Sequence, residues 1–258
     1  MTKTALITGA SAGLGVQFAR LFAAEKICLV LVARREDRLQ ELKSELEAGY
    51  GVQVHILPLD LTLPGAVGRV LEYLTSHAIE IEYLVNNAGF GKYGSFSDVS
   101  LELNLAQIDL NVRSLTELTG RLLPSMINKK RGRILNVGSI AGDQPGPFMA
   151  VYYASKAYVN SFSEAIHREL KGTGVTVTLS CPGPTFTEFT EVAQMGSNKL
   201  FEMNAMPADL VARQAYRAMM KGTRRITHGA RNKIASQLNR VTPRAVALSI
   251  VSFVNSSK

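Results

Sequence analysis

Two side chains one helical turn apart, Tyr152 and Lys156, offer the clearest chemistry in this sequence. Residues four apart project from one face of a helix, so the Lys156 ammonium is expected to lie beside the Tyr152 phenol. A free phenol has a pKa of about 10, and a neighbouring positive charge lowers it by favouring the phenolate. The pair therefore predicts a proton donor near neutral pH. Tyr153 points about 100° around the helix from Tyr152 and fits this role less well.

A third group, the hydroxyl of Ser139, is expected at the end of a strand at 133–139. Doubly wound sheets bind their ligands at the carboxyl ends of the strands. Hydride transfer to a ketone leaves an alkoxide, which needs a proton donor and a group that stabilises its charge. A serine at this position is usually structural when it stands alone, so the hypothesis depends on its combination with Tyr152 and Lys156.

A glycine-rich segment, Thr-Gly-Ala-Ser-Ala-Gly-Leu-Gly at 8–15, lies between the first expected strand and the first expected helix. Glycines let the backbone turn sharply and approach a pyrophosphate, and the helix that follows presents free N–H groups. The spacing differs from Gly-x-Gly-x-x-Gly but uses the same mechanics. The segment predicts a dinucleotide site formed by Gly9, Ser11, Gly13, Leu14 and Gly15.

The end of the second expected strand selects the nucleotide, because an acidic residue there would bind the ribose 2′-hydroxyl of NAD. Arg34 and Arg35 stand in its place. Guanidinium groups bind phosphate through charge-assisted hydrogen bonds, whereas two solvated arginines would leave the missing acid unexplained. The sequence therefore predicts NADP(H), with both arginines at the 2′-phosphate.

Short β-branched runs alternate with helical patterns along the chain, and most of these runs are continuously apolar, as in strands covered on both faces. Strands are expected at 4–8, 27–33, 52–57, 83–86, 133–139, 175–181 and 225–228. Helices are expected at 36–48, from Pro64 onward and from 151 to about 172. This alternation predicts an α/β fold: a doubly wound, Rossmann-like parallel sheet of about seven strands, with helices on both faces and a C-terminal helical tail.

The composition, with 46% hydrophobic and 19% charged residues among 258, fits a globular chain. Residues 1–258 contain no repeat or linker and are expected to form a single domain, with a substrate lid at 184–206 and a basic, apolar extension at 229–258. Two cysteines exclude a disulfide framework, and four scattered histidines offer no metal cluster. No segment is typical of a signal peptide or membrane span, so a cytoplasmic location is expected.

Further motifs follow in order: Asp60-Leu61 after the third strand, Asn-Asn-Ala-Gly at 86–89, Asn111, Ser139, Tyr152-x3-Lys156 and Pro182-Gly183. Together with the glycine loop, this ordered set resembles the short-chain dehydrogenase/reductase family in its compact, NADP-preferring form, from about residue 3 to 187. The resemblance implies an oxidoreductase that acts on CH–OH and C=O groups. A weaker resemblance, through the basic tail, is to long-chain 3-ketoacyl and steroid reductases.

The resemblance also implies roles for individual residues. Asn111 is expected to bind a water that passes protons to Lys156, which with Tyr152 also contacts the cofactor. The other cofactor contacts are expected from Asp60 and Leu61 at the adenine, Asn87, Ala88 and Gly89 at the adenosine ribose side, Pro182 and Gly183 at the nicotinamide, and Thr185 and Thr187 at the carboxamide or pyrophosphate.

The partner is expected to be a small molecule, a hydrophobic ketone or 3-oxoacyl group. Flexible apolar side chains in the expected lid and in a facing wall suit a large or variably shaped apolar substrate. Core packing would explain some of them equally well. A non-catalytic, NADP-sensing regulator is the alternative, although such relatives tend to lose the tyrosine or the lysine. The lid residues are Phe186, Phe189, Met195, Leu200, Phe201, Met203 and Met206, and the wall residues are Phe90, Tyr93, Pro145, Phe148 and Met149.

The C-terminal part is strongly cationic: 10 of the 29 basic residues follow Asp209, and no acidic residue does. The apolar run at 245–254 is too short to span a bilayer. It can lie on a membrane surface, dock across the lid or pair with another subunit, and we favour packing on its own domain or a second copy. A nucleic-acid partner is disfavoured because no known binding module is present. The resemblance implies a homo-oligomer, a dimer or tetramer, formed through the two long helices beside the active site.

Overall fold

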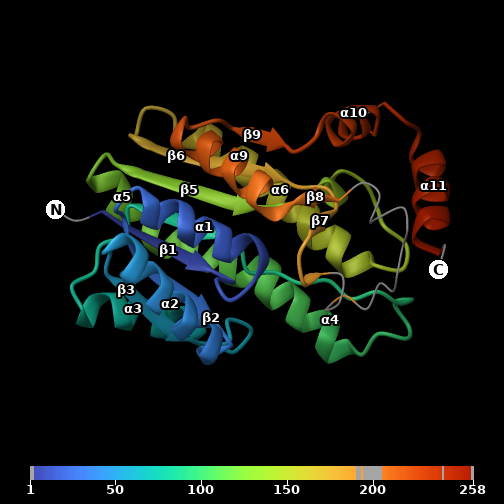
Figure 1. The fold of residues 1–258 in the computed structure, drawn as a ribbon. Coiled ribbons are helices and arrows are strands. Elements are labelled where there is room, and N and C mark those ends of the chain that lie inside the picture. The colour runs from blue at the N-terminus through green and yellow to red at the C-terminus, as the bar shows by residue number, and fades with distance from the viewer. Residues whose placement is uncertain (1–2, 190–192, 194–204, 240, 257–258) are drawn as a thin grey trace.

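The computed structural model describes residues 3–189, 193, 205–239 and 241–256 (Figure 1). Seven parallel strands form one sheet in the order β3-β2-β1-β4-β5-β6-β9. The strand order reverses between β1 and β4, and such a reversal opens a crevice at the carboxyl ends of the strands. The strands are β1 (Thr4–Thr8), β2 (Cys28–Ala33), β3 (Val54–Pro58), β4 (Tyr83–Asn86), β5 (Gly132–Val137), β6 (Val175–Cys181) and β9 (Arg225–Thr227).

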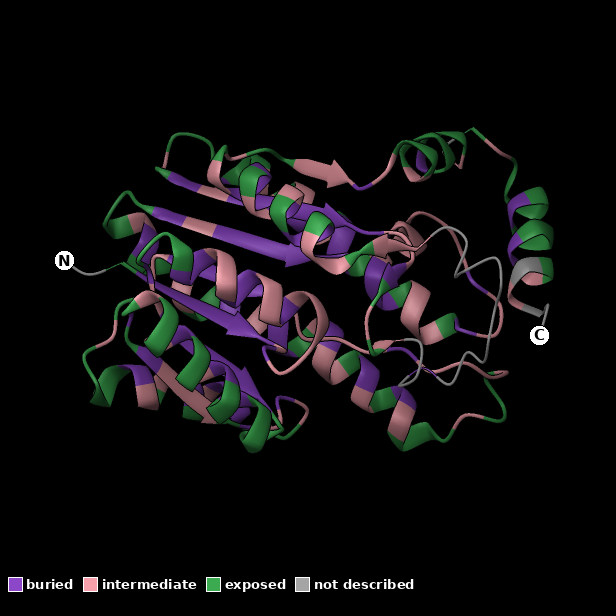
Figure 2. Ribbon diagram, viewed as in Figure 1, coloured by how far each residue is buried: buried purple, intermediate pink, exposed green. Residues whose placement is uncertain are grey.

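Helices cover both faces of this sheet, and Figure 2 shows its central strands buried beneath helices whose outer sides are exposed. One face packs against α1 (Gly13–Ala24), α2 (Glu36–Tyr50) and α9 (Ala208–Met220). The other packs against α3 (Ala66–Ser76), α5 (Leu115–Asn128) and α6 (Ala150–Glu169). Burial on both faces explains why the strands are continuously apolar.

The predicted fold class is confirmed, with differences at the edges of elements. The third strand begins at Val54 and the fifth ends at Val137, so Ser139 lies just beyond β5. A short pair of parallel strands that the sequence did not predict, β7 (Thr185–Phe186) and β8 (Met206–Pro207), joins the two ends of the expected lid. Within that lid, residues 190–192 and 194–204 lie outside the described part.

Between β4 and α5 the chain forms α4 (Leu101–Ile108) and then a π-helical segment, η1 (Asp109–Ser114). The segment runs directly into α5, so α4, η1 and α5 form one continuous helical rod. Asn111 is buried within its π-helical turn. A short 3-10 helix, η2 (Ile140–Asp143), follows β5.

The tail forms two helices, α10 (Ala230–Leu238) and α11 (Arg244–Ser256), at the end of the molecule where the strands terminate (Figure 1). On α11, Ala247 and Val251 are buried. The amide of Asn255 donates to the carbonyl of Pro147 at 2.8 Å, and its own carbonyl accepts from the Tyr93 hydroxyl at 2.8 Å. The tail therefore docks on its own chain. No helix in the described ranges is long and apolar enough to cross a membrane.

Candidate functional site

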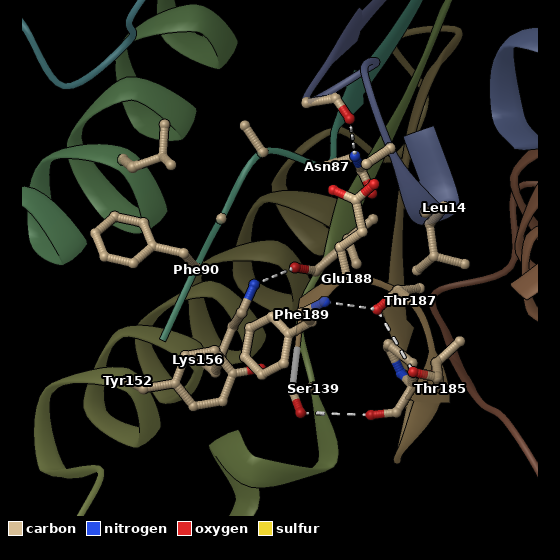
Figure 3. A pocket seen from close by; sticks show the side chains of 18 of the residues that line it. Leu14, Asn87, Phe90, Ser139, Tyr152, Lys156, Thr185, Thr187, Glu188 and Phe189 are labelled. Atoms are coloured by element: carbon tan, nitrogen blue, oxygen red, sulfur yellow. Dashed lines mark hydrogen bonds between the residues drawn. The ribbon is translucent and has the colours of Figure 1, made fainter. Parts of the chain in front are cut away.

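A cavity of about 700 Å³ opens at the carboxyl ends of the strands, beside the reversal between β1 and β4. Its walls come mainly from the loops after β1, β2, β3, β4, β5 and β6, and from α6. Nearly all of the residues that the sequence predicted as a site line this one cavity, and Figure 3 shows several of them. The exceptions are Gly15 and Asn111.

The glycine loop is fixed to the start of the loop after β4. The Thr8 hydroxyl accepts hydrogen bonds from the backbone N–H groups of Asn87 and Ala88, both at 3.0 Å, and the Asn87 amide donates to the carbonyl of Thr8 at 2.9 Å. Gly9 has a φ of +66°, and a Cβ there would lie 2.9 Å from the Cα of Ala88. Only glycine fits this turn without strain.

The loop leads into an open helix N-terminus. No side chain caps the first turn of α1, and that turn contains no acidic residue. Ala12, Gly13 and Leu14 all line the cavity. Uncapped N–H groups and the positive end of the helix dipole make this an anion site. The feature fits the pyrophosphate of a dinucleotide.

Gly15 does not line the cavity, contrary to the sequence prediction. It packs against the loop, and a Cβ at this position would lie 2.2 Å from the carbonyl oxygen of Gly9. The third glycine therefore serves close packing between helix and loop and makes no wall of the nucleotide site.

Arg34 and Arg35 line the same end of the cavity as Ser11 and Asp60. The guanidinium of Arg35 donates to the Ser11 carbonyl at 3.2 Å and pairs with the Glu188 carboxylate at 2.9 Å. Asp60 accepts from the backbone N–H of Thr62 at 2.9 Å, which fixes the loop after β3. The cationic pair beyond β2 fits a 2′-phosphate. Nothing in the sequence pattern pointed to Glu188.

At the other end, α6 places Tyr152 and Lys156 one turn apart, as predicted. The Nζ of Lys156 lies 5.9 Å from the centre of the Tyr152 ring and donates to the carbonyl of Val137 at 2.8 Å. Lys156 is 5% exposed. Burial lowers the pKa of this ammonium to about 8 because it disfavours the charged form.

We expected Lys156, together with the positive charge of an oxidised nicotinamide, to lower the pKa of Tyr152; the protein without cofactor raises it. Burial raises the pKa of the phenol above its ordinary value, and the hydrogen bond with Ser139 opposes this only in part. The Lys156 amine is not among the groups that shift it. Desolvation outweighs the neighbouring charge, which keeps the phenol protonated.

Ser139 is buried at the start of η2. Its hydroxyl accepts from the N–H of Ala141 at 3.1 Å and donates to the Pro182 carbonyl at 3.4 Å, and the Asn160 amide donates to its carbonyl at 2.9 Å. The long 3.4 Å contact leaves the hydroxyl hydrogen able to turn toward an oxygen in the cavity.

Asn111 lies behind the cavity wall. Its side chain accepts from the N–H of Phe90 at 3.0 Å and donates to the Phe90 carbonyl and the Ser155 hydroxyl, both at 2.9 Å. The side-chain amide of Asn111 is therefore engaged by protein partners. It clamps the loop after β4 to α6.

The expected substrate walls are only partly formed. Phe90, Met149 and Phe189 line the cavity, whereas Tyr93, Pro145, Phe148, Phe186 and Met206 do not, and Met195, Leu200, Phe201 and Met203 lie outside the described residues. The Phe189 ring lies 5.2 Å from that of Tyr152, between centroids. Asn232 and Asn255 of the tail also line the cavity, and their spacing in the sequence carried no signal for this.

Comparisons with known proteins agree with this geometry. Residues 3–198 match the short chain dehydrogenase family. Sulfoacetaldehyde reductase 2 of Chromohalobacter salexigens is 41% identical over 198 residues, covering 76% of this chain and 78% of that protein. Ketoacyl reductase HetN of a Nostoc species is 37% identical over 181 residues, covering 70% and 63%.

Solved structures agree as well. A short-chain dehydrogenase from Sphingobium yanoikuyae in complex with NADPH has a TM-score of 0.81 and 32% identity, covering 93% of this chain and 94% of its own. A structure of 7beta-hydroxysteroid dehydrogenase has a TM-score of 0.86 and 25% identity, covering 96% of both chains. The chain therefore belongs to the short-chain dehydrogenase family.

Proposed function

We propose that the protein is an NADPH-dependent carbonyl reductase that acts on a neutral, hydrophobic ketone or 3-oxoacyl group. One observation carries the proposal: the same cavity is lined by two groups of residues that suit the two ends of the reaction. Arg34 and Arg35 offer cationic side chains for a phosphate, and Tyr152, Lys156 and Ser139 offer groups that can donate a proton. The family resemblance and the NADPH complex of a related dehydrogenase support the same cofactor.

The cofactor's two ends are assigned to different loops of the cavity. The N-terminus of α1 takes the pyrophosphate, and Arg34 and Arg35 take the 2′-phosphate. Asp60 and Leu61 contact the adenine, and Asn87, Ala88 and Gly89 line the adenosine ribose side. Pro182, Gly183, Thr185 and Thr187 form the nicotinamide end. All of these residues line the cavity, which supports the assignment.

The chemistry that bound NADPH supplies is hydride donation. The hydroxyl of Ser139 donates to the substrate oxygen and stabilises the negative charge that develops on it. The phenol of Tyr152 then gives its proton to that oxygen. Its raised pKa keeps the proton available until the alkoxide forms, and the ammonium of Lys156 stabilises the phenolate left behind.

Reprotonation of Tyr152 is assigned to Lys156 and a water held at η1. Because the Asn111 amide is already bonded to Phe90 and Ser155, we assign the water to the main chain of this π-helical turn. π-helical turns displace carbonyl groups from the regular ladder and recur at functional sites. Asn111 then acts as a positioning residue.

A neutral substrate is favoured by the groups around Tyr152. Phe90, Met149 and Phe189 are apolar, and the polar groups beside them are the amides of Gln144, Asn232 and Asn255. Among the described lining residues at this end, Lys156 is the single cation. Sulfoacetaldehyde, which two relatives are named for, carries a sulfonate that would need a further cationic partner.

A screen of NADPH consumption across ketones of increasing chain length and bulk tests the proposal. We expect turnover that rises with apolar size up to the part of the cavity that bound NADPH leaves open. If no ketone oxidises NADPH although NADPH binds tightly, the protein is an NADP-sensing regulator instead. The retention of both Tyr152 and Lys156 favours the enzyme.

Assembly and location belong to the same proposal. Leu101, Leu105 and Ile108 of α4 and Tyr158 of α6 are exposed, which supports a homo-oligomer formed through these helices. We further propose one domain over 1–258, a lid at 184–206 and, because both cysteines are free, a cytoplasmic location. Peripheral membrane contact through the 229–258 extension is supported only by its basic residues and its outward apolar side chains.

A further inference from the structure

Arg35 connects two segments that border the nucleotide end of the cavity. Its guanidinium contacts the carbonyl and hydroxyl of Ser11 in the glycine loop, at 3.2 and 3.4 Å. The same group pairs with the carboxylate of Glu188 at 2.9 Å. Glu188 therefore competes for the charge that the proposed function assigns to the 2′-phosphate.

The neighbours of Glu188 reach other parts of the site. A Cβ added to Gly13 would lie 3.0 Å from Cγ2 of Thr187, so Thr187 lies against the glycine loop. Phe189 packs on Tyr152. The N–H of Phe189 donates to the Thr187 hydroxyl at 3.3 Å, which makes the three residues one compact turn. Figure 3 shows Thr187, Glu188 and Phe189 within the same pocket as Tyr152.

The Arg35–Glu188 ion pair is weak enough for a ligand to displace one partner. The two side chains are 42% and 46% exposed, and ion pairs at such exposure add little stability. A phosphate monoester carries more negative charge than a carboxylate, and it has three acceptor oxygens. It therefore binds a shared guanidinium more strongly than the carboxylate does. A dinucleotide without a 2′-phosphate offers Arg35 no such replacement.

We propose that Glu188 determines cofactor selectivity: its carboxylate holds Arg35 until a 2′-phosphate replaces it, and the exchange releases Phe189 from Tyr152. The inference rests on the proposed function, since it takes Arg35 as a phosphate ligand. NADP(H) would free the catalytic phenol as it binds, whereas NAD(H) would leave the Arg35–Glu188 pair and the covering ring in place. A ligand can shift such an equilibrium only through differential affinity, and the 2′-phosphate supplies it.

Equilibrium binding of two adenosine fragments tests the competition without any turnover. Adenosine 2′,5′-bisphosphate and adenosine 5′-monophosphate differ only in the 2′-phosphate, and calorimetry gives both dissociation constants at low salt. We expect E188Q to tighten binding of the bisphosphate about two- to fivefold and to leave the monophosphate unchanged. The matched control is E36Q, which removes an exposed carboxylate at the start of α2 and should change neither.

The release of Phe189 has its own readout. The chain contains no tryptophan, so F189W adds a single reporter beside Tyr152. The bisphosphate fragment ends at its 5′-phosphate and lacks the nicotinamide half of the cofactor, and it should nevertheless change the tryptophan emission. The monophosphate should not. In the E188Q/F189W double variant, the ligand-free protein should already show the shifted emission.

The R35Q variant separates the two hypotheses. If R35Q leaves bisphosphate affinity unchanged, the phosphate site itself is misplaced and the cofactor assignment fails with it. If R35Q weakens bisphosphate binding but E188Q alters neither fragment, or tightens both equally, only the competition is wrong. An unchanged F189W emission would overturn the release step. In an R35Q background, E188Q should have no further effect on bisphosphate affinity.

Discussion

The carboxylate of Asp143 and the guanidinium of Arg225 form a largely buried ion pair at 2.6 Å, with side chains 10% and 22% exposed. Asp143 is the last residue of η2, the short helix that directly follows Ser139, and Arg225 is the first residue of β9. The hydroxyl of Ser236 on α10 also donates to this carboxylate, at 2.6 Å. The Ser139 segment is therefore held from outside by the sheet edge and the tail.

Removing the Asp143 charge should be strongly destabilising. D143N leaves the Arg225 guanidinium uncompensated in a partly buried site, and we expect a loss of about 3 kcal/mol in the free energy of unfolding. Urea denaturation measures it. The control, E41Q, breaks an exposed pair with Arg38 and should cost less than about 1 kcal/mol. Equal losses in the two variants would contradict this role.

Tyr152 should carry the proton transfer. We expect Y152F to lower the turnover number for a reducible ketone by about 10²- to 10⁴-fold, because the phenol proton has no substitute, while the dissociation constant for NADPH changes little. Initial rates and fluorescence titration give the two quantities. Y153F, which also removes a cavity-lining hydroxyl, should keep most of the turnover. Substantial activity in Y152F would refute the assigned acid.

Arg34 should contribute to the preference for NADPH. R34D places a carboxylate where a ribose 2′-hydroxyl can use it and removes a phosphate partner, so we expect the ratio of kcat/KM for NADPH over NADH to fall about 10- to 100-fold. R38Q, on the exposed side of α2, serves as the control. An unchanged ratio in R34D would show that other groups hold the phosphate.

The buried Lys156 should make stability depend on pH. Its pKa is lowered to about 8 in the folded chain, so between about pH 8 and 10.5 the unfolded state binds more protons. The contribution of this group to the free energy of unfolding therefore rises with pH across that window, by at most about 1.4 kcal/mol per pH unit. Comparing K156M with wild type from pH 7.5 to 9.5, below the titration of free tyrosine, isolates it. A parallel pH profile in K156M would be inconsistent with the buried ammonium.

Docking of α11 should depend on its inner face. Val251 is 6% exposed and its neighbour Ile250 is 56% exposed. We expect V251N to release the tail, to increase proteolysis there and to raise the KM for bulky ketones, since Asn255 leaves the cavity wall. I250N makes the same kind of substitution at the exposed neighbouring position and should have none of these three effects. Deleting 229–258 should expose apolar surface, and intact solubility, assembly and activity would contradict the docking.

The fold could be predicted from the sequence because strands covered on both faces, such as β1 and β2, have little choice but to be continuously apolar. The reacting groups were predictable for a related reason: Tyr152 and Lys156 lie on one helix, where spacing determines proximity. The balance between the two effects on the pKa of Tyr152, the nearby charge of Lys156 and the burial of the phenol, was not predictable. Whether desolvation or charge governs the pKa of Tyr152 depends on groups that are remote in the chain, such as Ser139 and Phe189.

The predicted residues that do not line the cavity show the same limit. Gly15 was assigned to the nucleotide because a glycine can serve close packing or ligand approach, and only its distance from Gly9 decides between them. The partners of the Asn111 side chain, Phe90 and Ser155, were not predictable because they are remote in the chain. Glu188, Asn232 and Asn255 have no local pattern, since their positions follow from how the segments after β6 return to the cavity.

The π-helical turn of η1 has a consequence for the long rod formed by α4, η1 and α5. Such a turn arises from one inserted residue, which offsets the rotational phase of the two flanking helices. After it, α5 directs Leu115 and Leu118 into the core. Before it, α4 buries the polar Asn104 and Gln107 and leaves Leu101 and Leu105 exposed. A single-residue deletion within 109–114 would rotate the first half by about 100° against the second. One extra residue thus determines whether the apolar stripe of α4 faces outward, where a neighbouring molecule could cover it, or inward, toward the chain's own core.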